Sequence, residues 1–429
     1  MLSVGESVVL PESGRTAQIV AFIGEGGQGT VFEALIDDTP VAIKWYFEHV
    51  GTDSQRQAVR DLIERGAPSD RFLWPSEMIE LDRVPGFGYV MPLRPAEYRK
   101  LRDLFGRVDV DPIARTTLCR ELAECFLSLH IQGLCYRDIS FSNIFFEPNT
   151  GKPLICDNDN VGIDGRASTG VLGTRTFMAP EIIREEVGPS IDTDRWSLAV
   201  VLFYILVVGH PLLGRRELRF KYWNEESERE LLGRAPLFVF DPDDQANAPD
   251  PVEHASMSIN WRHLPVFVRR LFTKSFTEGL RDPRNGRIPE SQWRRDMSRL
   301  GDSVVTCTKC GVRGFFDMTQ PLDCRGCGRR IEPPLRLVFK DGKVLILSDG
   351  AKVYQHHVDR LPSYNFKPVA EVTRHPSNKD VWGLRNVDDQ AWTATGPTGD
   401  STVIAPTRSF GLVPGTVFRF GSAEARLEH

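Results

Sequence analysis

The change in hydrophobic period along the chain constrains its fold more than any other feature. Residues 1 to about 92 contain short β-branched or apolar runs separated by Gly, Pro and Asp, which is typical of strands joined by turns. From about residue 112 to 300 the apolar residues recur every three or four positions, which indicates helices. A β-rich lobe followed by a helical lobe predicts a two-lobed α+β unit over residues 1–301.

The same patterns predict individual elements. We expect one helix over residues 53–65 in the β-rich part and two longer helices over 115–132 and 193–208. Thr193 or Asp192 is the expected N-cap of the last of these. Strands are predicted over residues 7–10, 16–23, 30–35, 41–46, 87–91, 335–339, 343–347 and 402–405.

The remainder of the chain changes character twice. A Cys-rich segment covers residues 302–333, and strand-like runs follow from 334 to 426. We therefore predict a small lobe (1–92), a large lobe (93–301), a Cys-rich module (302–333) and a small all-β domain resembling a sandwich (334–426). We interpret residues 427–429 as the remnant of an expression tag.

Composition excludes some classes of protein. The formal net charge of −5 argues against a general binder of nucleic acid or anionic membranes. The most apolar run, residues 198–208, is about half of the ~20 residues needed to span a bilayer, so we expect a buried helix there and no membrane span. The first residues lack the pattern of a signal peptide, so we expect a cytoplasmic protein whose thiols stay reduced.

A glycine-rich segment, residues 24–31 (GEGGQGTV), lies between two predicted strands. Glycines let backbone N–H groups approach phosphate oxygens, because no Cβ stands in the way. An ordinary hairpin explains the segment equally well when it is taken alone. A dinucleotide-binding fold would need a helix next, whereas residues 31–35 are typical of a strand.

Lys44 ends the next apolar strand, residues 41–44 (VAIK). A lysine in that place is usually a surface residue with a buried stem. After a glycine-rich hairpin, however, it is placed to pair with the α- and β-phosphates of a nucleotide.

Three further polar residues follow in the large lobe. Asp138 and Asn143 lie in residues 136–143 (YRDISFSN), and Asp157 ends a short apolar run. A carboxylate and an amide at these positions would make the hard-oxygen site that Mg²⁺ prefers, with phosphate oxygens and water completing it. A polar turn before a strand is the structural alternative for residues 138–143.

Together with residues 179–181 (APE), these segments resemble the signature motifs of the protein kinase family. The resemblance implies a two-lobed kinase fold that binds ATP and Mg²⁺. Asp138 would accept the proton of the substrate hydroxyl, while Asn143 and Asp157 would hold Mg²⁺ and Lys44 the phosphates. Ser140 stands where many members have a lysine that contacts the γ-phosphate.

The resemblance also implies a nucleotide site and its surroundings. Glu64, or Asp61, would pair with Lys44 from the following helix. Residues 157–159 (DND) replace the usual Asp-Phe-Gly, and Asp159 could add a carboxylate near the metal ions. The residues expected around ATP are Gly24, Gly26, Gly29, Val31, Ala42, Lys44, Met91, Pro92, Leu93 and Arg94.

The segment before residues 179–181 resembles a kinase activation segment. The family implies that Thr174 hydrogen-bonds Asp138, that Glu181 pairs with Arg287, and that Asp194 braces the catalytic loop. A phosphorylated segment could dock on Arg137. The candidate phosphorylation sites are Ser168, Thr169, Thr174 and Thr176.

Two Cys-x-x-Cys pairs, each followed by Gly, carry Cys307, Cys310, Cys324 and Cys327. Four thiolates at this spacing are typical of a zinc ribbon, whose closed tetrahedral site is structural. A redox pair or disulfides are the alternative. In the tail, residues 356–357, 382–386 and 418–421 resemble a forkhead-associated fold without its phosphate-binding residues, and we interpret His356 and His357 as structural before metal-binding.

A kinase followed by a zinc ribbon and a β tail resembles the bacterial kinases of the tellurite-resistance-associated phosphorylation triad. That resemblance implies a von Willebrand A-type protein and a metal-dependent phosphatase as partners, besides protein substrates. The sequence therefore favours a protein Ser/Thr kinase that phosphorylates partners and itself. An ATP-binding pseudokinase scaffold, a small-molecule kinase and a binding protein that acts through its β tail are the alternatives.

Overall fold

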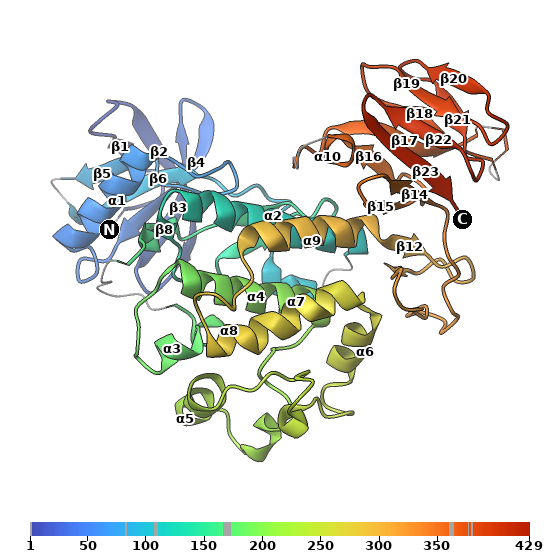
Figure 1. Ribbon diagram of the computed structural model, residues 1–429. Coiled ribbons are helices and arrows are strands. Elements are labelled where there is room, and N and C mark those ends of the chain that lie inside the picture. Colours follow the sequence, from blue (N-terminus) through green and yellow to red (C-terminus); the bar gives the residue numbers. More distant parts are fainter. Residues whose placement is uncertain are drawn as a thin grey trace. The chain divides into compact units, whose positions relative to one another are not determined.

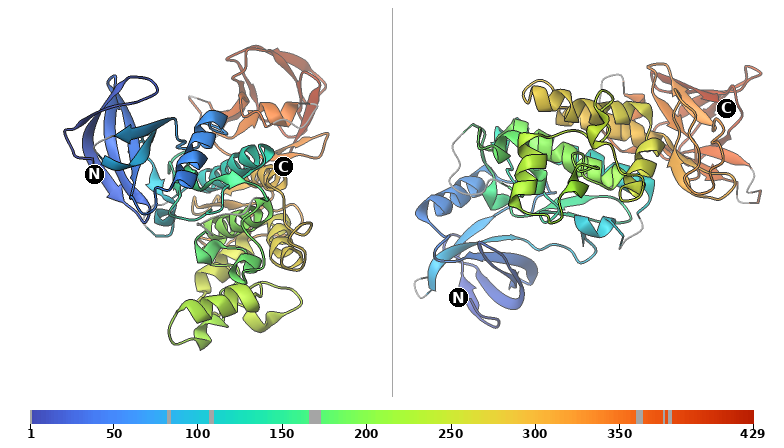
Figure 2. Two further views of the ribbon diagram at one scale, coloured as in Figure 1. Left: turned by 90° about the vertical axis from the view of Figure 1, so that its left-hand side faces the viewer. Right: turned by 90° about the horizontal axis from the view of Figure 1, so that it is seen from below.

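The computed structural model describes residues 2–81, 84–106, 110–165, 173–359, 364–375, 377–378 and 381–429. The chain divides into two compact units. The first comprises Met1–Val110, Thr117–Asn260 and Arg270–Arg294, and the second comprises Asp111–Thr116, Trp261–Arg269 and Arg295–His429. Figures 1 and 2 show the elements, and each unit is described by itself.

The first lobe of the first unit is one antiparallel sheet of six strands in the order β1-β2-β3-β4-β6-β5 (blue in Figure 1). Every strand predicted here is present, while β5 was not predicted. The strands are β1 (Ser7–Val9), β2 (Thr16–Glu25), β3 (Gly29–Ile36), β4 (Thr39–Tyr46), β5 (Glu77–Leu81) and β6 (Val84–Pro92).

Helix α1 (Asp53–Arg65) has the predicted bounds. The Thr52 side chain accepts a hydrogen bond from the Gln55 N–H at its start, and Gly66, with φ of 74°, ends it. Val59 and Leu62 are its buried residues, and Val59 packs with Tyr46 and Tyr89 of the sheet.

Strand β4 has a buried face on each side. Ile43 and Trp45 belong to one apolar cluster, whereas Ala42 and Tyr46 belong to another that includes Val59 of α1. Because side chains alternate along a strand, Lys44 lies on the same face as Ala42 and Tyr46. The alternation therefore directs the Lys44 ammonium toward the side of the sheet that carries α1.

The large lobe is mainly helical, as predicted. Its long helices are α2 (Pro112–Ile131), α4 (Ile191–Val207), α6 (Ala255–His263), α7 (Val266–Phe276) and α9 (Glu290–Asp302), with short α3 (Pro180–Ile183), α5 (Glu225–Glu228) and α8 (Glu278–Arg281). The intervening helical turns are η1 (Leu101–Leu104), η2 (Asn158–Asn160), η3 (Arg175–Phe177), η4 (Glu217–Arg219), η5 (Arg229–Arg234) and η6 (Gln245–Asn247).

Two small sheets support the loops of the large lobe. One has the order β10-β9-β7 and the other pairs β11 with β8. Their strands are β7 (Arg99–Lys100), β8 (Leu134–Cys135), β9 (Ile144–Phe146), β10 (Pro153–Ile155) and β11 (Gly162–Ile163).

Helix α4 is buried on nearly all sides, so it is a core helix of its lobe. Its N-cap is Ser190 and not Thr193 or Asp192, so that prediction was wrong by two or three residues. The reason is a capping box: the Ser190 side chain accepts a hydrogen bond from the Thr193 N–H, and the Thr193 hydroxyl accepts one from the Ser190 N–H.

The second unit contains the Cys-rich module and an all-β domain. The module has one antiparallel pair, β12 (Val304–Thr306) and β13 (Arg313–Phe315). The β domain has two sheets, ordered β15-β14-β23-β22-β19-β20 and β16-β17-β18-β21, whose side chains share one apolar core. This arrangement is a sandwich. Its elements are β14 (Arg336–Phe339), β15 (Val344–Ile346), β16 (Lys352–Tyr354), α10 (Gln355–Val358), β17 (Pro368–Arg374), β18 (Trp382–Asn386), β19 (Trp392–Thr395), β20 (Ser401–Ile404), β21 (Ser409–Gly411), β22 (Val417–Phe420) and β23 (Ala423–Glu428).

Two of the residues interpreted from the sequence as a tag remnant lie in a strand of this domain. Leu427 and Glu428 belong to β23, where they pair with Leu337 and Arg336 of β14. Leu427 is 1% exposed, and the Arg336 guanidinium lies 3.0 Å from the Glu428 carboxylate. These residues are part of the sheet.

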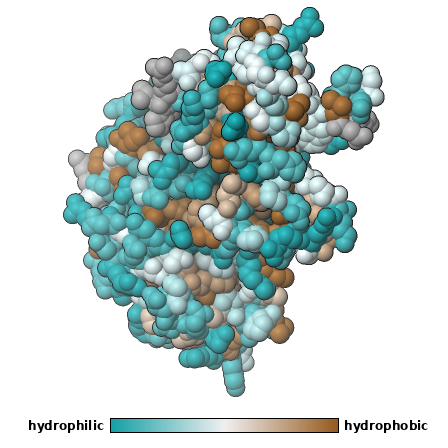
Figure 3. All heavy atoms as spheres, turned by 45° about the vertical axis from the view of Figure 1, so that its right-hand side comes forward, coloured by the Kyte–Doolittle hydropathy of each residue, from teal (hydrophilic) through white to brown (hydrophobic). Residues whose placement is uncertain are grey.

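Across the described residues, no helix is long and apolar enough to cross a membrane. On the face shown in Figure 3, apolar residues are interspersed with hydrophilic ones.

We expect Leu427→Ala to lower the free energy of unfolding of the β domain by about 2–5 kcal/mol, because it leaves a cavity in the sandwich core. Denaturant unfolding followed by tryptophan fluorescence measures this. Val403→Ala, at a residue of β20 that is 68% exposed, is the control and should change stability by less than about 0.5 kcal/mol. An equally small effect of Leu427→Ala would contradict the placement of β23.

Candidate active site and metal centre

The glycine-rich turn joins β2 to β3. A Cβ on Gly29 would lie 2.1 Å from the Trp45 carbonyl oxygen, so only glycine fits against β4 at this point. Gly24 and Gly26 face open space instead, with no atom within 4 Å of an added Cβ. Close packing therefore requires Gly29, whereas the open backbone at Gly24 and Gly26 is free to lie against a ligand.

Lys44 is at the centre of a polar cluster. Its Nζ lies 2.7 Å from Asp159 Oδ2, 3.6 Å from Asp157 Oδ1 and 2.9 Å from Gln28 Oε1. Gln28 belongs to the glycine-rich turn and also donates to the Asn160 side chain at 3.0 Å. The cluster thus joins β4, the glycine-rich turn and the segment after β10.

The electrostatics of this cluster keep Lys44 charged. Burial by itself would lower the pKa of Lys44, but the carboxylates of Asp159 and Asp157 outweigh it and raise the pKa above its ordinary value. The Tyr46 hydroxyl donates to the same Asp159 oxygen. Burial and the nearby Asp159 carboxylate raise the pKa of Tyr46 far above its ordinary value, so Tyr46 remains a neutral donor.

Asp138 is held by two partners. Its Oδ2 accepts a hydrogen bond from Asn143 Nδ2 at 2.9 Å, and its Oδ1 accepts from the backbone N–H and the hydroxyl of Thr174, both at 2.8 Å. The expected contact between Thr174 and Asp138 is confirmed. These bonds orient the carboxylate and connect residues 136–143, the expected catalytic loop, to the end of the expected activation segment.

Asp157 lies beside this loop. The Cys156 N–H donates to the Asn143 carbonyl at 3.0 Å, which places Asn143 next to Asp157 along the backbone. Asp157 has a left-handed backbone (φ 52°, ψ 44°), and its side chain is 45% exposed. Asn158, which stands where the family has Phe, is buried and donates to the carbonyls of Leu73 and Ile155. Asp157 therefore remains accessible while Asn158 anchors the segment.

Several of the other residues expected around ATP lie on paired strands of the sheet. Ala42 pairs with Met91 across β4 and β6, and Val41 pairs with Pro92. Met91 is buried and Pro92 is exposed, while Leu93 and Arg94 are half-buried. Val31 of β3 pairs with Lys44, so Val31, Ala42 and Met91 lie around the strand that carries the lysine.

Some expected residues lie elsewhere. Glu64 and Asp61 of α1 are exposed, and Asp61 accepts a hydrogen bond from Gln57 at 2.8 Å. Ser140 is buried and hydrogen-bonds Ser142 at 2.8 Å. Ser168 and Thr169 lie outside the described residues. Sequence reasoning did not identify Gln28, Tyr46 or Gln55, although the alternation along β4 could have indicated Tyr46.

Buried ion pairs brace the large lobe. Asp194 accepts hydrogen bonds from the N–H groups of Tyr136 and Arg137, the latter at 3.0 Å, which confirms its expected role. The Arg287 guanidinium lies 2.7 Å from the Glu181 carboxylate, so that pair is also confirmed. His210 donates from Nε2 to the Thr176 carbonyl at 2.9 Å, and burial lowers its pKa to about 4, so it stays neutral.

His130 lies between two carboxylates. Its ring nitrogens are 3.1 Å from Asp194 and 2.7 Å from Glu290. Burial opposes the charge, but hydrogen bonds to Asp194 and Glu290 raise the pKa of His130 to about 9. The charged imidazole therefore holds the aspartate that supports the catalytic loop.

Comparison with known proteins identifies this region. Residues 89–256 match the family model described as "Protein kinase domain". The chain contains a protein kinase domain. The match includes Met91, Asp138, Asn143 and Asp157, whereas Lys44 and the glycine-rich turn lie before it.

Relatives of this region include proteins named as serine/threonine-protein kinases. The chain is 26% identical over 270 residues to serine/threonine-protein kinase 33 of Mus musculus, covering 56% of this chain and 54% of that protein. It is 24% identical over 253 residues to CBL-interacting serine/threonine-protein kinase 15 of Arabidopsis thaliana, covering 52% and 56%. The chain thus spans about half the length of these relatives.

Beyond the kinase domain, four thiols gather in the Cys-rich module. Cys307 Sγ lies 3.7 Å from Cys327 Sγ, and Cys310 Sγ lies 3.5 Å from Cys324 Sγ. These distances are too long for disulfides, and all four cysteines are free. In a tetrahedral site with metal–sulfur bonds of about 2.3 Å, neighbouring sulfur atoms are about 3.8 Å apart, and the observed distances fit this spacing. The cluster could hold a metal ion.

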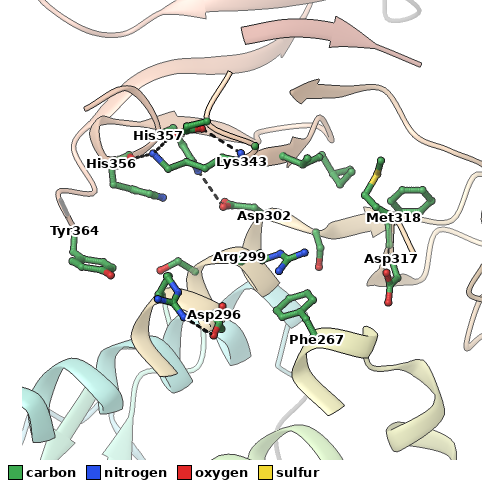
Figure 4. A pocket seen from close by; sticks show the side chains of 18 of the residues that line it. Phe267, Asp296, Arg299, Asp302, Asp317, Met318, Lys343, His356, His357 and Tyr364 are labelled. Carbon is green, nitrogen blue, oxygen red and sulfur yellow. Dashed lines mark hydrogen bonds and ion pairs between the residues drawn. The ribbon is translucent and has the colours of Figure 1, made fainter. Parts of the chain in front are cut away.

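His356 and His357 line a cavity of about 640 Å³ in the second unit, together with Asp302 (Figure 4). The three side chains offer ligand atoms within 4.8 Å of one another. However, His357 Nδ1 accepts the Tyr354 N–H at 2.9 Å, and His357 Nε2 lies 3.1 Å from Asp302. A metal at Nε2 would leave the ring without a proton, so these hydrogen bonds favour the structural interpretation.

We expect the thermal unfolding midpoint of the kinase domain to fall by several degrees between pH 6.5 and 9. An unfolded histidine titrates near about 6.5, whereas folded His130 has a pKa of about 9. Its stabilising contribution is therefore complete below about pH 6.5 and is lost as the pH rises through 9.

Differential scanning fluorimetry at a series of pH values measures this, and His130→Gln should remove most of the slope. The control is His210→Gln. Because the pKa of His210 is about 4, its own pH dependence lies below pH 6.5, and the slope above it should persist. A slope unchanged in His130→Gln would contradict the charged imidazole.

Proposed function

We propose that this chain is an ATP- and Mg²⁺-dependent protein kinase that phosphorylates Ser or Thr hydroxyls of partner proteins and of its own activation segment. The observation that carries the proposal is the grouping of Lys44 with Asp157 and of Asp138 with Asn143, from three separate segments. The kinase-domain match and the Ser/Thr kinase relatives support the same reaction.

In this proposal each residue has one role. Lys44 binds phosphate oxygens, and Gly24 and Gly26 approach them with their backbone. Asn143 and Asp157 hold Mg²⁺, which neutralises charge on the phosphates when bound. Asp138 orients the attacking Ser or Thr hydroxyl and accepts its proton. Ser140, which is buried and hydrogen-bonded to Ser142, replaces the lysine that contacts the γ-phosphate in many kinases. Of the residues assigned here, Lys44 therefore supplies the positive charge that faces the phosphates.

The adenine would lie between Val31, Ala42 and Met91. Pro92 has no N–H, so its carbonyl and the backbone of Leu93 and Arg94 supply the hydrogen bonds to the base. The Arg94 side chain is engaged elsewhere: it donates to the Tyr98 carbonyl at 2.6 Å and stacks on Phe145.

We propose that the four-cysteine cluster binds one structural Zn²⁺. Four thiolates leave no open coordination position, so the ion would stabilise the module and take no part in phosphoryl transfer. The small module has little apolar core of its own, and metal binding would supply its folding free energy.

Finer features of the proposal rest on resemblance. The order of kinase, Cys-rich module and β domain, together with the departures from the kinase motifs at Ser140 and Asp159, supports a bacterial kinase of the tellurite-resistance-associated triad. Its proposed partners are a von Willebrand A-type protein and a phosphatase, and its β domain is proposed to have a forkhead-associated fold. The eight free cysteines support a reducing, cytoplasmic location. The alternative function is an ATP-binding scaffold that organises a complex without transferring phosphate.

We expect Asp138→Asn to lower the rate of phosphoryl transfer by about 10²–10⁴-fold, because the base is lost, while ATP affinity stays within a few-fold. Asp157→Ala should abolish transfer by removing a Mg²⁺ ligand. Incorporation of labelled phosphate into the chain and into a general protein substrate measures the rate, and mass spectrometry locates the sites, with Thr174 and Thr176 among the candidates.

Asp38→Asn, in the exposed turn before β4, is the matched control and should transfer phosphate like the unaltered chain. Transfer that persists in Asp157→Ala would overturn the assignment. A chain that binds ATP but never transfers phosphate would favour the scaffold.

We expect about one zinc ion per purified chain, measured by atomic absorption. Cys310→Ser with Cys324→Ser should release the metal and lower the unfolding midpoint of the second unit, because two of the four ligands are lost. Cys119→Ala removes a buried thiol of the kinase domain and should leave the zinc content unchanged. A zinc-free chain with an unaltered second unit would show that the cluster is not a metal site.

A further inference from the structure

The partner of Lys44 comes from an unexpected segment. Asp159, the third residue of the segment that replaces Asp-Phe-Gly, places Oδ2 at 2.7 Å from Lys44 Nζ. The Lys44 side chain is 6% exposed and that of Asp159 is 0% exposed. Asp157, at 3.6 Å, is more distant and its side chain is 45% exposed. Asp159 is therefore the nearest and most buried counter-charge of the lysine.

Two further residues hold Asp159 in place. Tyr46 lies two residues after Lys44 on the same face of β4, and its hydroxyl donates to the same Oδ2 atom. Gln55 of α1 donates both to the Tyr46 hydroxyl and to the Asp159 carbonyl, each at 3.2 Å. Strand β4, helix α1 and turn η2 thus meet at Asp159.

Helix α1, which is described throughout its length, brings no acid to this point. Glu64 and Asp61 are exposed, and the helix reaches the cluster through the neutral amide of Gln55. An ammonium this buried needs a carboxylate, because an unpaired buried charge is strongly disfavoured. Asp159 meets that need, so α1 is not required to supply a charge.

We propose that Asp159 is the positioning residue that holds Lys44 toward the nucleotide phosphates, in place of an acid from α1. The proposal rests on the proposed kinase function for the role of Lys44. It assigns Asp159 to the lysine and not to a metal ion.

A double-mutant cycle on nucleotide binding tests the proposal. Isothermal titration calorimetry with ATP in EDTA compares the unaltered chain with Lys44→Met, Asp159→Asn and the double variant. We expect each single variant to bind ATP at least tenfold more weakly, and the double variant to bind no more weakly than Lys44→Met. Effects that multiply in the double variant would overturn the proposal.

Two further measurements separate positioning from other roles. Adenosine has no phosphate, so its affinity should be the same in Asp159→Asn and in the unaltered chain; an equal loss for adenosine would indicate a merely structural residue. A loss of ATP affinity that occurs with Mg²⁺ but not in EDTA would instead make Asp159 a metal ligand. Either result would overturn the proposal.

Matched variants decide between the two candidate acids. Glu64→Gln and the control Asp38→Asn should bind ATP within twofold of the unaltered chain, and Tyr46→Phe should weaken binding a few-fold by releasing Asp159. A larger loss in Glu64→Gln than in Asp159→Asn would assign the pairing to α1 and overturn the proposal.

Folding and catalysis are kept apart in this design. Should Asp159→Asn fail to fold with Lys44 unpaired, the double variant has no buried charge and is compared directly with Lys44→Met; tenfold weaker binding in the double variant would then overturn the proposal. Phosphate transfer is measured separately. If the unaltered chain transfers no phosphate while the binding cycle shows full coupling, the kinase proposal fails and the role of Asp159 stands.

Discussion

The buried ammonium of Lys44 is the interaction on which the candidate site depends. The Lys44 side chain is only 6% exposed, so its charge has to be matched mainly inside the protein. The matching carboxylate arrives from Asp159, 115 residues further along the chain. This one pair brings the strand of the small lobe and the loop after β10 into contact, and Gln28 and Tyr46 complete the connection.

The catalytic loop depends on a second set of buried charges. Asp194 receives two backbone N–H groups of the loop, and the charged His130 ties Asp194 to Glu290. Glu290 also receives Arg195 at 2.9 Å, and the pKa of Glu290 is held at about 2, because hydrogen bonds from His130 and Arg195 outweigh its burial. Asp138 is thus presented by a loop whose support consists of ion pairs between mostly buried side chains.

Replacing Asp-Phe-Gly by Asp-Asn-Asp changes how the segment is anchored. Phe would be held by apolar packing, whereas Asn158 is held by two hydrogen bonds to backbone carbonyls. These bonds fix the turn η2, which in turn directs Asp159 toward Lys44 and leaves Asp157 accessible. The two departures from the family pattern are therefore connected, since Asn158, which anchors the segment, and Asp159, which pairs with Lys44, belong to the same turn.

The periodicity of the sequence determined most of the secondary structure, because one face or both faces of each element must be apolar to pack. The bounds of α1, the strands around Lys44 and the β-rich tail follow from that rule alone. The motifs also singled out Asp138, Asn143 and Asp157 as candidate site residues, since a motif depends on local order along the chain. Only the tertiary structure decided which acid pairs with Lys44, that His130 is charged, and that Leu427 is a core residue. Each of these depends on a partner distant in the sequence, and no local pattern records which segments burial brings together.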